Sequence, residues 1–170
     1  KNFGGIGSII GHEITHGFDD QGRKFDENGD LNDWWTQQDE DEYKKIQDKV
    51  EKLYGSQTVE GMKLNGKLTL GENIADIGGV SISLEALSEY LNLHPEENTK
   101  ENGLSPYHLF FINYATIWRS NIRPEEAKKR VITDPHSPPK LRVNLVLSQM
   151  KMFYDVFKIK SDNKYFVNIF

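Results

Sequence analysis

The feature that most constrains the fold is a pair of histidines four residues apart, in the segment His12-Glu13-Ile14-Thr15-His16. On an α-helix, residues four apart lie on one face about one turn apart, so both imidazoles point the same way. Such a pair suits two ligands of one tetrahedral Zn²⁺ ion, with Glu13 near enough to accept a proton. Two solvated histidines flanking a glutamate give the same pattern, so the segment alone leaves both interpretations open.

A catalytic zinc site requires a third protein ligand, and Glu72-Asn73-Ile74-Ala75-Asp76 offers two candidates. Glu72 and Asp76 also share a helical face, so one carboxylate can bind the metal while the other accepts the second N–H of a ligating histidine. Gly78 and Gly79 follow directly. Glycine is unfavourable inside a helix, but close approach of two helices requires it. The alternative interpretation is an acidic, solvated helix face.

The spacing of apolar residues predicts a mainly α fold. Helices are expected up to about His16, from a Thr36/Asp39 capping box through Leu53, over about 70–91, from Ser105-Pro106 through Trp118, briefly from Pro124, and over about 144–157. The connections are expected at residues 17–35, 55–69, 94–104 and 134–139, and the tail 158–170 has no clear period.

Composition narrows the function classes. The chain has 170 residues and a net charge of −5, which disfavours nucleic acid and anionic membranes as partners. No apolar run approaches the length of a membrane span. The absence of cysteine excludes disulfides, thiolate zinc sites and cysteine nucleophiles. Because the chain opens on Lys1 rather than Met, we expect it to be part of a longer protein.

Three segments resemble the neprilysin and endothelin-converting-enzyme family of zinc endopeptidases, and within it the bacterial oligoendopeptidases. They are GGIGSIIGHEITHGFDDQGRKFDENGDLNDWW, LGENIADIGG and DPHSPPKLRVN, and the likeness extends over essentially all 170 residues. The resemblance implies a thermolysin-like catalytic lobe of the zincin and gluzincin type. It also implies that residues 1–170 form a single domain, the C-terminal catalytic domain of a longer peptidase.

The resemblance assigns the metal site. It implies that His12, His16 and Glu72 are the ligands of one Zn²⁺ per chain. It further implies that Glu13 is the general base, which takes a proton from a zinc-activated water and later delivers it to the departing amine.

The same resemblance assigns the surrounding residues. Asp76 and Asp19 match the acids that hold the two histidines, without indicating which acid holds which ring, and Asp76 is counted among the catalytic residues. His136 matches a histidine that donates a hydrogen bond to the tetrahedral intermediate, and Arg142 an arginine that grips the substrate's carbonyl or C-terminal carboxylate. From the residues alone, His136 could simply cap a turn, and Arg142 would be interpreted as a surface charge.

The implied function is therefore zinc-dependent hydrolysis of peptide bonds in oligopeptides. The expected partners are a peptide substrate and the N-terminal lobe of the protein's own full-length chain, with no nucleic acid and no membrane contact from this segment. Since relatives bind the substrate backbone through an upstream Asn-Ala segment that this sequence lacks, we expect the chain alone to bind zinc but to cleave peptides poorly.

Two alternatives and the compartment remain open. The chain could be a non-catalytic fragment or pseudoenzyme that acts as a zinc-binding or interaction module, although decay would normally remove at least one of His12, Glu13, His16 and Glu72. An aminopeptidase is disfavoured because its second glutamate motif differs from Glu72–Asp76. The lack of cysteine favours a bacterial cytoplasm over an extracellular or surface-anchored location.

Overall fold

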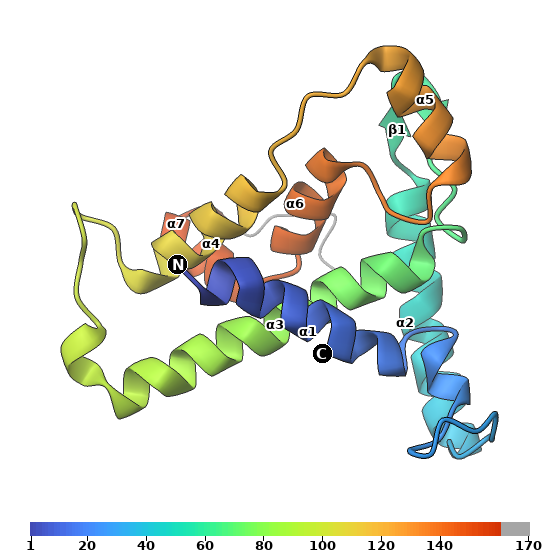
Figure 1. The fold of residues 1–170 in the computed structure, drawn as a ribbon, viewed down its shortest axis with the longest axis horizontal. Helices are drawn as coiled ribbons and strands as arrows, with labels where there is room; N and C mark the ends of the chain where they lie inside the picture. The colour runs from blue at the N-terminus through green and yellow to red at the C-terminus, as the bar shows by residue number, and fades with distance from the viewer. Residues whose placement is uncertain (161–170) are drawn as a thin grey trace.

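The computed structural model describes residues 1–160 and is mainly helical, which confirms the predicted class (Figure 1). Residues 161–170, most of the expected tail, lie outside the described residues. The elements in chain order are the π-helical turn η1 (Phe3–Gly7), α1 (Ser8–Thr15), the 3₁₀ turns η2 (His16–Phe18) and η3 (Gly22–Lys24), α2 (Gln37–Gly55), β1 (Thr58–Val59), β2 (Met62–Lys63), α3 (Leu70–Leu93), the 3₁₀ turn η4 (Pro95–Glu97), α4 (Pro106–Ile117), α5 (Pro124–Thr133), α6 (Pro139–Leu147) and α7 (Lys151–Phe157).

The short helix α1 lies antiparallel against the long helix α3, with their backbones in direct contact. A Cβ atom built on Gly79 would lie 2.5 Å from the backbone nitrogen of His12, and one built on Gly11 would lie 2.7 Å from the carbonyl oxygen of Gly79. Gly78 similarly lies against the side chain of Thr15. Only glycine permits this approach, so the glycines predicted to bring two helices together do so.

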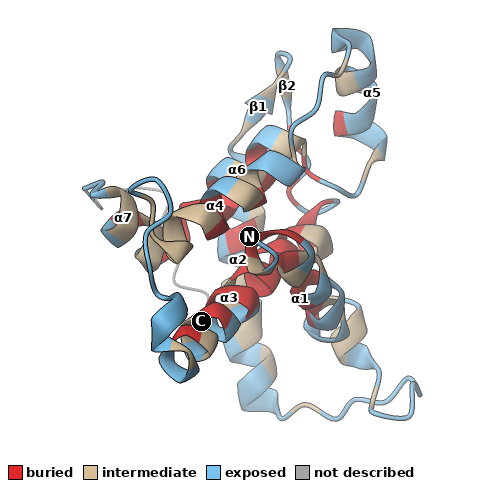
Figure 2. Cartoon of the chain, turned by 60° about the vertical axis from the view of Figure 1, so that its left-hand side comes forward, coloured by how far each residue is buried: buried red, intermediate tan, exposed pale blue. Residues whose placement is uncertain are grey.

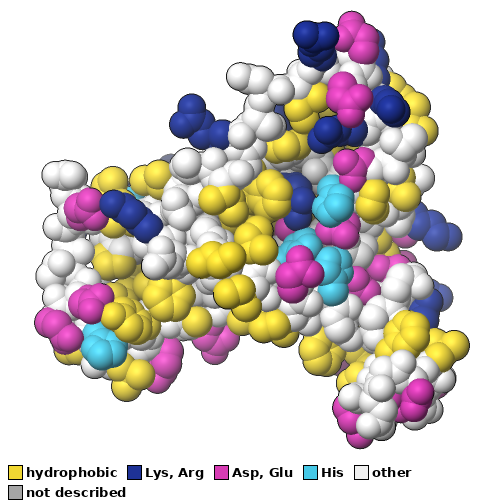
Figure 3. All heavy atoms as spheres, in the orientation of Figure 1, with side chains coloured by type: hydrophobic (Ala, Val, Ile, Leu, Met, Phe, Trp, Pro, Cys, Tyr) yellow, Lys and Arg dark blue, Asp and Glu magenta, His cyan; other side chains and the backbone are white. Residues whose placement is uncertain are grey.

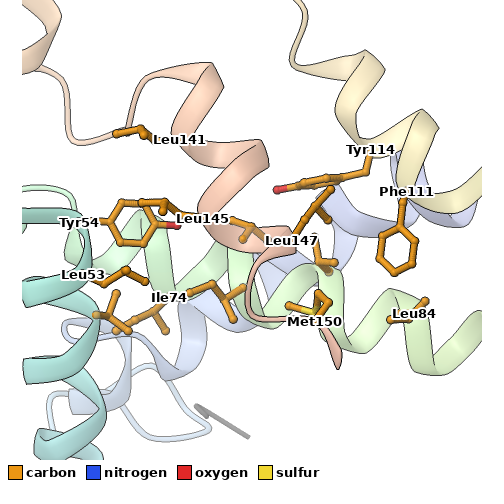
Figure 4. Close-up of a cluster of buried hydrophobic side chains, with 14 of the residues drawn as sticks. Leu53, Tyr54, Ile74, Leu84, Phe111, Tyr114, Leu141, Leu145, Leu147 and Met150 are labelled. Carbon is orange, nitrogen blue, oxygen red and sulfur yellow. The ribbon is translucent and has the colours of Figure 1, made fainter. Parts of the chain in front are cut away.

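The hydrophobic core lies where α3 meets α2, α4 and α6. Figure 2 shows buried residues concentrated along the middle of α1 and α3 and exposed residues at the outer ends. Figure 4 shows Tyr54 and Leu53 from α2 facing Ile74 of α3 and Leu145 of α6. The largest fully buried side chains are Tyr54, Tyr114, Phe110 and Phe111. At about 25 cal/mol per Å² of apolar surface, these aromatic rings contribute several kcal/mol to folding.

Two helix starts follow the predicted capping chemistry. Thr36 accepts a hydrogen bond from the backbone N–H of Asp39, whose carboxylate accepts one from the backbone N–H of Thr36. Ser105 caps α4 in the same way, with Pro106 in the first turn, where its missing N–H costs nothing.

The single helix predicted over 144–157 is wrong. The structure has α6, which already begins at Pro139, and α7, which begins only at Lys151. The hydroxyl of Ser148 and the side-chain amide of Gln149 both donate to the carbonyl of Leu145, and Met150 is extended. Such side-chain bonds compete with the helical backbone bonds and end α6, while apolar residues of both helices still reach one core.

Within residues 1–160, no helix combines the length and the apolar character that crossing a membrane requires.

Replacing Gly79 by alanine should force α1 and α3 apart. The added methyl group would meet backbone atoms of His12 and Ser8, which cannot move aside independently. We expect the free energy of unfolding to fall by about 1–3 kcal/mol or more, as measured by urea denaturation. Gly55→Ala is the matched control: its Cβ would find no atom closer than 3.7 Å, and we expect a change within about 1 kcal/mol. Equal stabilities of the two variants would contradict this account.

Candidate metal centre

Two imidazoles meet at the C-terminal end of α1. The Nε2 atoms of His12 and His16 lie 3.0 Å apart, and the ring planes are perpendicular. His12 is buried, whereas His16, where the chain tightens into η2, is half-buried. Each ring therefore presents one nitrogen to the same point in space, and the helical spacing seen in the sequence produces this geometry.

Glu72 completes a cluster of three donors from the first turn of α3. Its Oε2 atom lies 3.2 Å from His12 Nε2, and its Oε1 atom lies 3.7 Å from His16 Nε2. Among the described residues, this is the group of histidine and acidic side chains whose donor atoms all lie within 4.8 Å of one another. Figure 3 shows histidine and acidic side chains gathered at the middle of this face, bordered by hydrophobic ones.

The donor set fits a zinc ion. Zinc–nitrogen bonds of about 2.0–2.1 Å at tetrahedral angles place ligand atoms about 3.4 Å apart, close to the separations seen between these donors. Glu72 Oε2 is a buried oxygen that accepts no hydrogen bond within residues 1–160. An unsatisfied carboxylate oxygen facing two imidazole nitrogens indicates a cation-binding site.

A separate carboxylate orients each histidine. Asp76 Oδ1 lies 2.8 Å from Nδ1 of His12, and Asp19 Oδ2 lies 2.6 Å from Nδ1 of His16. The backbone N–H groups of Gln21 and Gly22 donate to the other oxygen of Asp19 and fix its loop. With both Nδ1 atoms held in this way, both Nε2 atoms face the centre of the cluster. Asp76 therefore holds the ring of His12, and Asp19 holds the ring of His16.

Arg142 lies in the protein interior, contrary to its interpretation as a surface charge. Its side chain is 9% exposed and donates two hydrogen bonds of 2.7 Å to the carboxylate of Asp76. The guanidinium carbon lies 3.8 Å from the ring centroid of Trp118. Asp76 therefore holds His12 and Arg142 at once, and the stacked, bidentate geometry suits arginine but not lysine.

His136 lies on the other side of Glu72, with its Nε2 atom 3.2 Å from Glu72 Oε2. Asp134 holds this histidine through one oxygen, which lies 2.8 Å from the ring Nδ1 and accepts the backbone N–H of His136 at 2.9 Å. The turn that the residues alone suggested is thus present, and it aims the imidazole at the cluster. Glu13 lies on the exposed side of α1 and makes no hydrogen bond or ion pair within residues 1–160.

The electrostatics of the cluster follow from these contacts. Burial lowers the pKa of His12, but the hydrogen bond to Asp76 and the contact with Glu72 outweigh it and raise the pKa to about 9. Burial acts to raise the pKa of Glu72, yet His12, His136 and His16 together bring it below its ordinary value. Without a cation, a proton on His12 relieves the repulsion between the converging donors.

A cavity of about 260 Å³ adjoins the cluster. His136 and Arg142 form part of its wall, beside the apolar side chains of Trp118, Ile122 and Ala127. A cleft with an apolar wall and a few polar groups is the usual form of a small-ligand site.

Sequence reasoning missed Asp134 and Trp118 as parts of this site. The sequence predicts Trp118 only as the last residue of a helix, and nothing in its spacing indicates that it stacks on a guanidinium. Asp134 carried a local signal: a residue two positions before a histidine can hold both its backbone and its ring.

The sequence profile of peptidase family M13 matches residues 1–169. The chain is 43% identical over 167 residues to neprilysin of Mus musculus and 40% identical over 158 residues to endothelin-converting enzyme 1 of Homo sapiens. These matches cover 95% and 92% of this chain but only 22% and 20% of those proteins. The chain thus spans about one fifth of the length of the curated relatives it matches.

Solved structures give the same result. The zinc metalloprotease Zmp1 of Mycobacterium tuberculosis in complex with an inhibitor matches with a TM-score of 0.91 and 40% identity over 98% of this chain and 26% of that one. PepO from Lactobacillus rhamnosis matches with a TM-score of 0.82 and 32% identity over 99% of this chain and 25% of that one.

The metal-free protein should lose stability as the pH rises through about 9. The pKa of His12 is about 9 in the folded protein against an ordinary value of 6.5, so the folded state binds this proton more tightly. The contribution of the His12 proton to the free energy of unfolding is complete below pH 6.5 and disappears as the pH passes about 9. Thermal unfolding of metal-depleted protein across this range checks the expectation. A His12→Gln control should show a flatter profile, and parallel profiles would argue against it.

Proposed function

The chain belongs to peptidase family M13, and from this premise we propose that the protein of which it is a part is a zinc-dependent endopeptidase that hydrolyses peptide bonds of oligopeptides. The observation that carries the proposal is the convergence of His12, His16 and Glu72, with both imidazoles fixed by carboxylates, beside a cavity. The name of the relative Zmp1, a zinc metalloprotease, supports the same chemistry.

His12, His16 and Glu72 would hold one Zn²⁺ per chain. When bound, the ion supplies a Lewis acid that polarises the scissile carbonyl and acidifies a water molecule. The side chains of this chain must transfer protons, stabilise negative charge and align the substrate.

Proton transfer is assigned to Glu13. It follows His12 on α1, its side chain is exposed, and no ion pair within residues 1–160 competes for its carboxylate. It takes the proton of the attacking water and delivers it to the departing amine. A positioned carboxylate in this role contributes about 10²- to 10⁴-fold to the rate.

His136 and Arg142 align and stabilise the reacting peptide. Nδ1 of His136 donates to the carboxylate of Asp134, and the Nε2 atom faces the cluster. In the imidazolium form of the ring, in which both nitrogens carry a proton, Nε2 donates a hydrogen bond to the oxyanion that forms during attack. Arg142 borders the cavity, and its Nε and Nη2 atoms are bound to Asp76. The Nη1 atom makes no hydrogen bond within residues 1–160, and we assign it to the substrate's carbonyl or C-terminal carboxylate.

An apolar ridge along η1, α1 and η2 supports the rest of the protein's own chain as a partner. Ile6, Ile10, Ile14 and Phe18 follow one another at four-residue spacing, and each is 51–60% exposed. Four large apolar side chains in one exposed row normally mark a contact surface. Since the relatives are several times longer, the remainder of the full-length chain is the occupant we propose. Residues 1–170 alone would then be a zinc-binding module with weak peptidase activity.

Glu13→Gln should separate metal binding from catalysis. The three metal donors are unchanged, so we expect the same zinc content by elemental analysis, with turnover of a short peptide by the full-length protein reduced about 10²- to 10⁴-fold. Glu85→Gln, an exposed glutamate on α3, is the control and should retain full activity. His12→Ala should instead lose the zinc. Near-normal cleavage by Glu13→Gln would reject the assignment.

Ile10→Ser in the full-length protein tests the ridge. If the remainder of the chain covers Ile10, the substitution should lower the stability by about 1.5–3 kcal/mol, the value of one buried aliphatic side chain. Ile132→Ser, at another exposed isoleucine, on α5, should change the stability by less than about 0.5 kcal/mol. Thermal unfolding compares the two variants, and matching midpoints would count against the proposed contact.

A further inference from the structure

Two buried polar side chains stand directly beside the proposed catalytic groups, and no step above uses them. Asn73 follows Glu72 in α3 and is fully buried, and Ser137 follows His136 and is 2% exposed. The hydroxyl of Ser137 donates a hydrogen bond of 2.6 Å to the side-chain oxygen of Asn73. This bond joins two segments that are distant in sequence, at the positions adjacent to Glu72 and His136.

The amide of Asn73 has a fixed orientation. Its Nδ2 group donates to the hydroxyl of Thr69 at 2.9 Å, and that hydroxyl donates to the carbonyl of Asn65 at 3.3 Å. Thr69 is also fully buried. With the amide turned over, the Ser137 hydroxyl would accept from Nδ2, and its own buried proton would lose the acceptor it has here, which is costly. The side-chain oxygen of Asn73 is therefore held toward Ser137.

The loop that carries His136 has few other attachments. Prolines at 135, 138 and 139 provide no N–H groups, and Asp134, which holds the imidazole, belongs to the same loop and moves with it. Within residues 1–160, the Ser137–Asn73 bond is the hydrogen bond that joins residues 134–138 to an element other than α5 and α6. The imidazole itself is 45% exposed, so packing alone does not hold it.

We propose that Ser137 is a positioning residue for His136, acting through its buried hydrogen bond to Asn73. The bond fixes the distance between the loop of residues 134–138 and α3. It thereby keeps His136 Nε2 at 3.2 Å from Glu72 Oε2, a position from which this nitrogen can reach the oxyanion. This inference rests on the proposed peptidase function. A small displacement of a hydrogen-bond donor that stabilises an oxyanion strongly reduces the rate of the chemical step, because the protein must hold the donor in place before the negative charge develops.

The first test compares Ser137→Ala with Ser83→Ala in the zinc-loaded full-length protein. Ser83 is an equally buried serine, on α3, whose hydroxyl donates to the carbonyl of Phe3 at 2.6 Å. We expect Ser137→Ala to lower kcat about tenfold with KM and zinc content nearly unchanged, and Ser83→Ala to leave kcat within about twofold. Equal kcat values for the two variants would overturn the inference.

The second test shows whether Ser137 acts through His136. In a His136→Ala background, adding Ser137→Ala should change kcat by less than about twofold, because the group being positioned is gone. The same tenfold loss in both backgrounds would reject the positioning role.

Hydrogen exchange provides a readout that does not depend on activity. The loop amides of residues 134–138 should exchange faster in zinc-free Ser137→Ala than in Ser83→Ala, and equal exchange would overturn the inference. If the zinc-loaded full-length protein without substitutions cleaves no peptide, both the proposed function and this inference are overturned. If that protein cleaves peptides and its Ser137→Ala variant has the same kcat, this inference alone is overturned.

Discussion

The site depends on the backbone contact between α1 and α3. The glycines at 11, 78 and 79 remove the side chains that would otherwise separate the two helices, and the antiparallel arrangement then brings the histidines of one helix against the acids of the other. A larger interhelical distance would move Glu72 and Asp76 away from both rings together. The contact of Glu72 with the histidine rings and the hydrogen bond from Asp76 to His12 both depend on the close packing of α1 against α3.

Asp76 links the cluster of His12, His16 and Glu72 to the cavity beside it. Its two oxygens are shared between His12 and Arg142, both of which are buried. A buried carboxylate with one cationic partner is expensive to desolvate, whereas partners on two sides satisfy its lone pairs. The arginine in turn stacks on Trp118 beside the cavity. A single carboxylate thus holds side chains from α1 and α6.

The sequence predicted what is local. The spacing of His12 with His16, and of Glu72 with Asp76, fixes which side chains share a helical face, and the capping residues Thr36 and Ser105 mark where two helices begin. Long-range pairings were not predictable from spacing: nothing near Ser137 in the sequence points to Asn73. The break between α6 and α7 was missed because the apolar periodicity continues across it, although Ser148 and Gln149 end the first helix by bonding to its last turn.

The three metal donors come from two helices that are far apart in the chain, so they assemble only when α1 and α3 have docked. If these residues hold Zn²⁺ as proposed, any affinity for the ion is affinity for the folded state, and the ion would act as a removable cross-link between α1 and α3. The population of folded chain would then follow the supply of the ion, and less ion would leave more unfolded chain exposed to quality-control proteases.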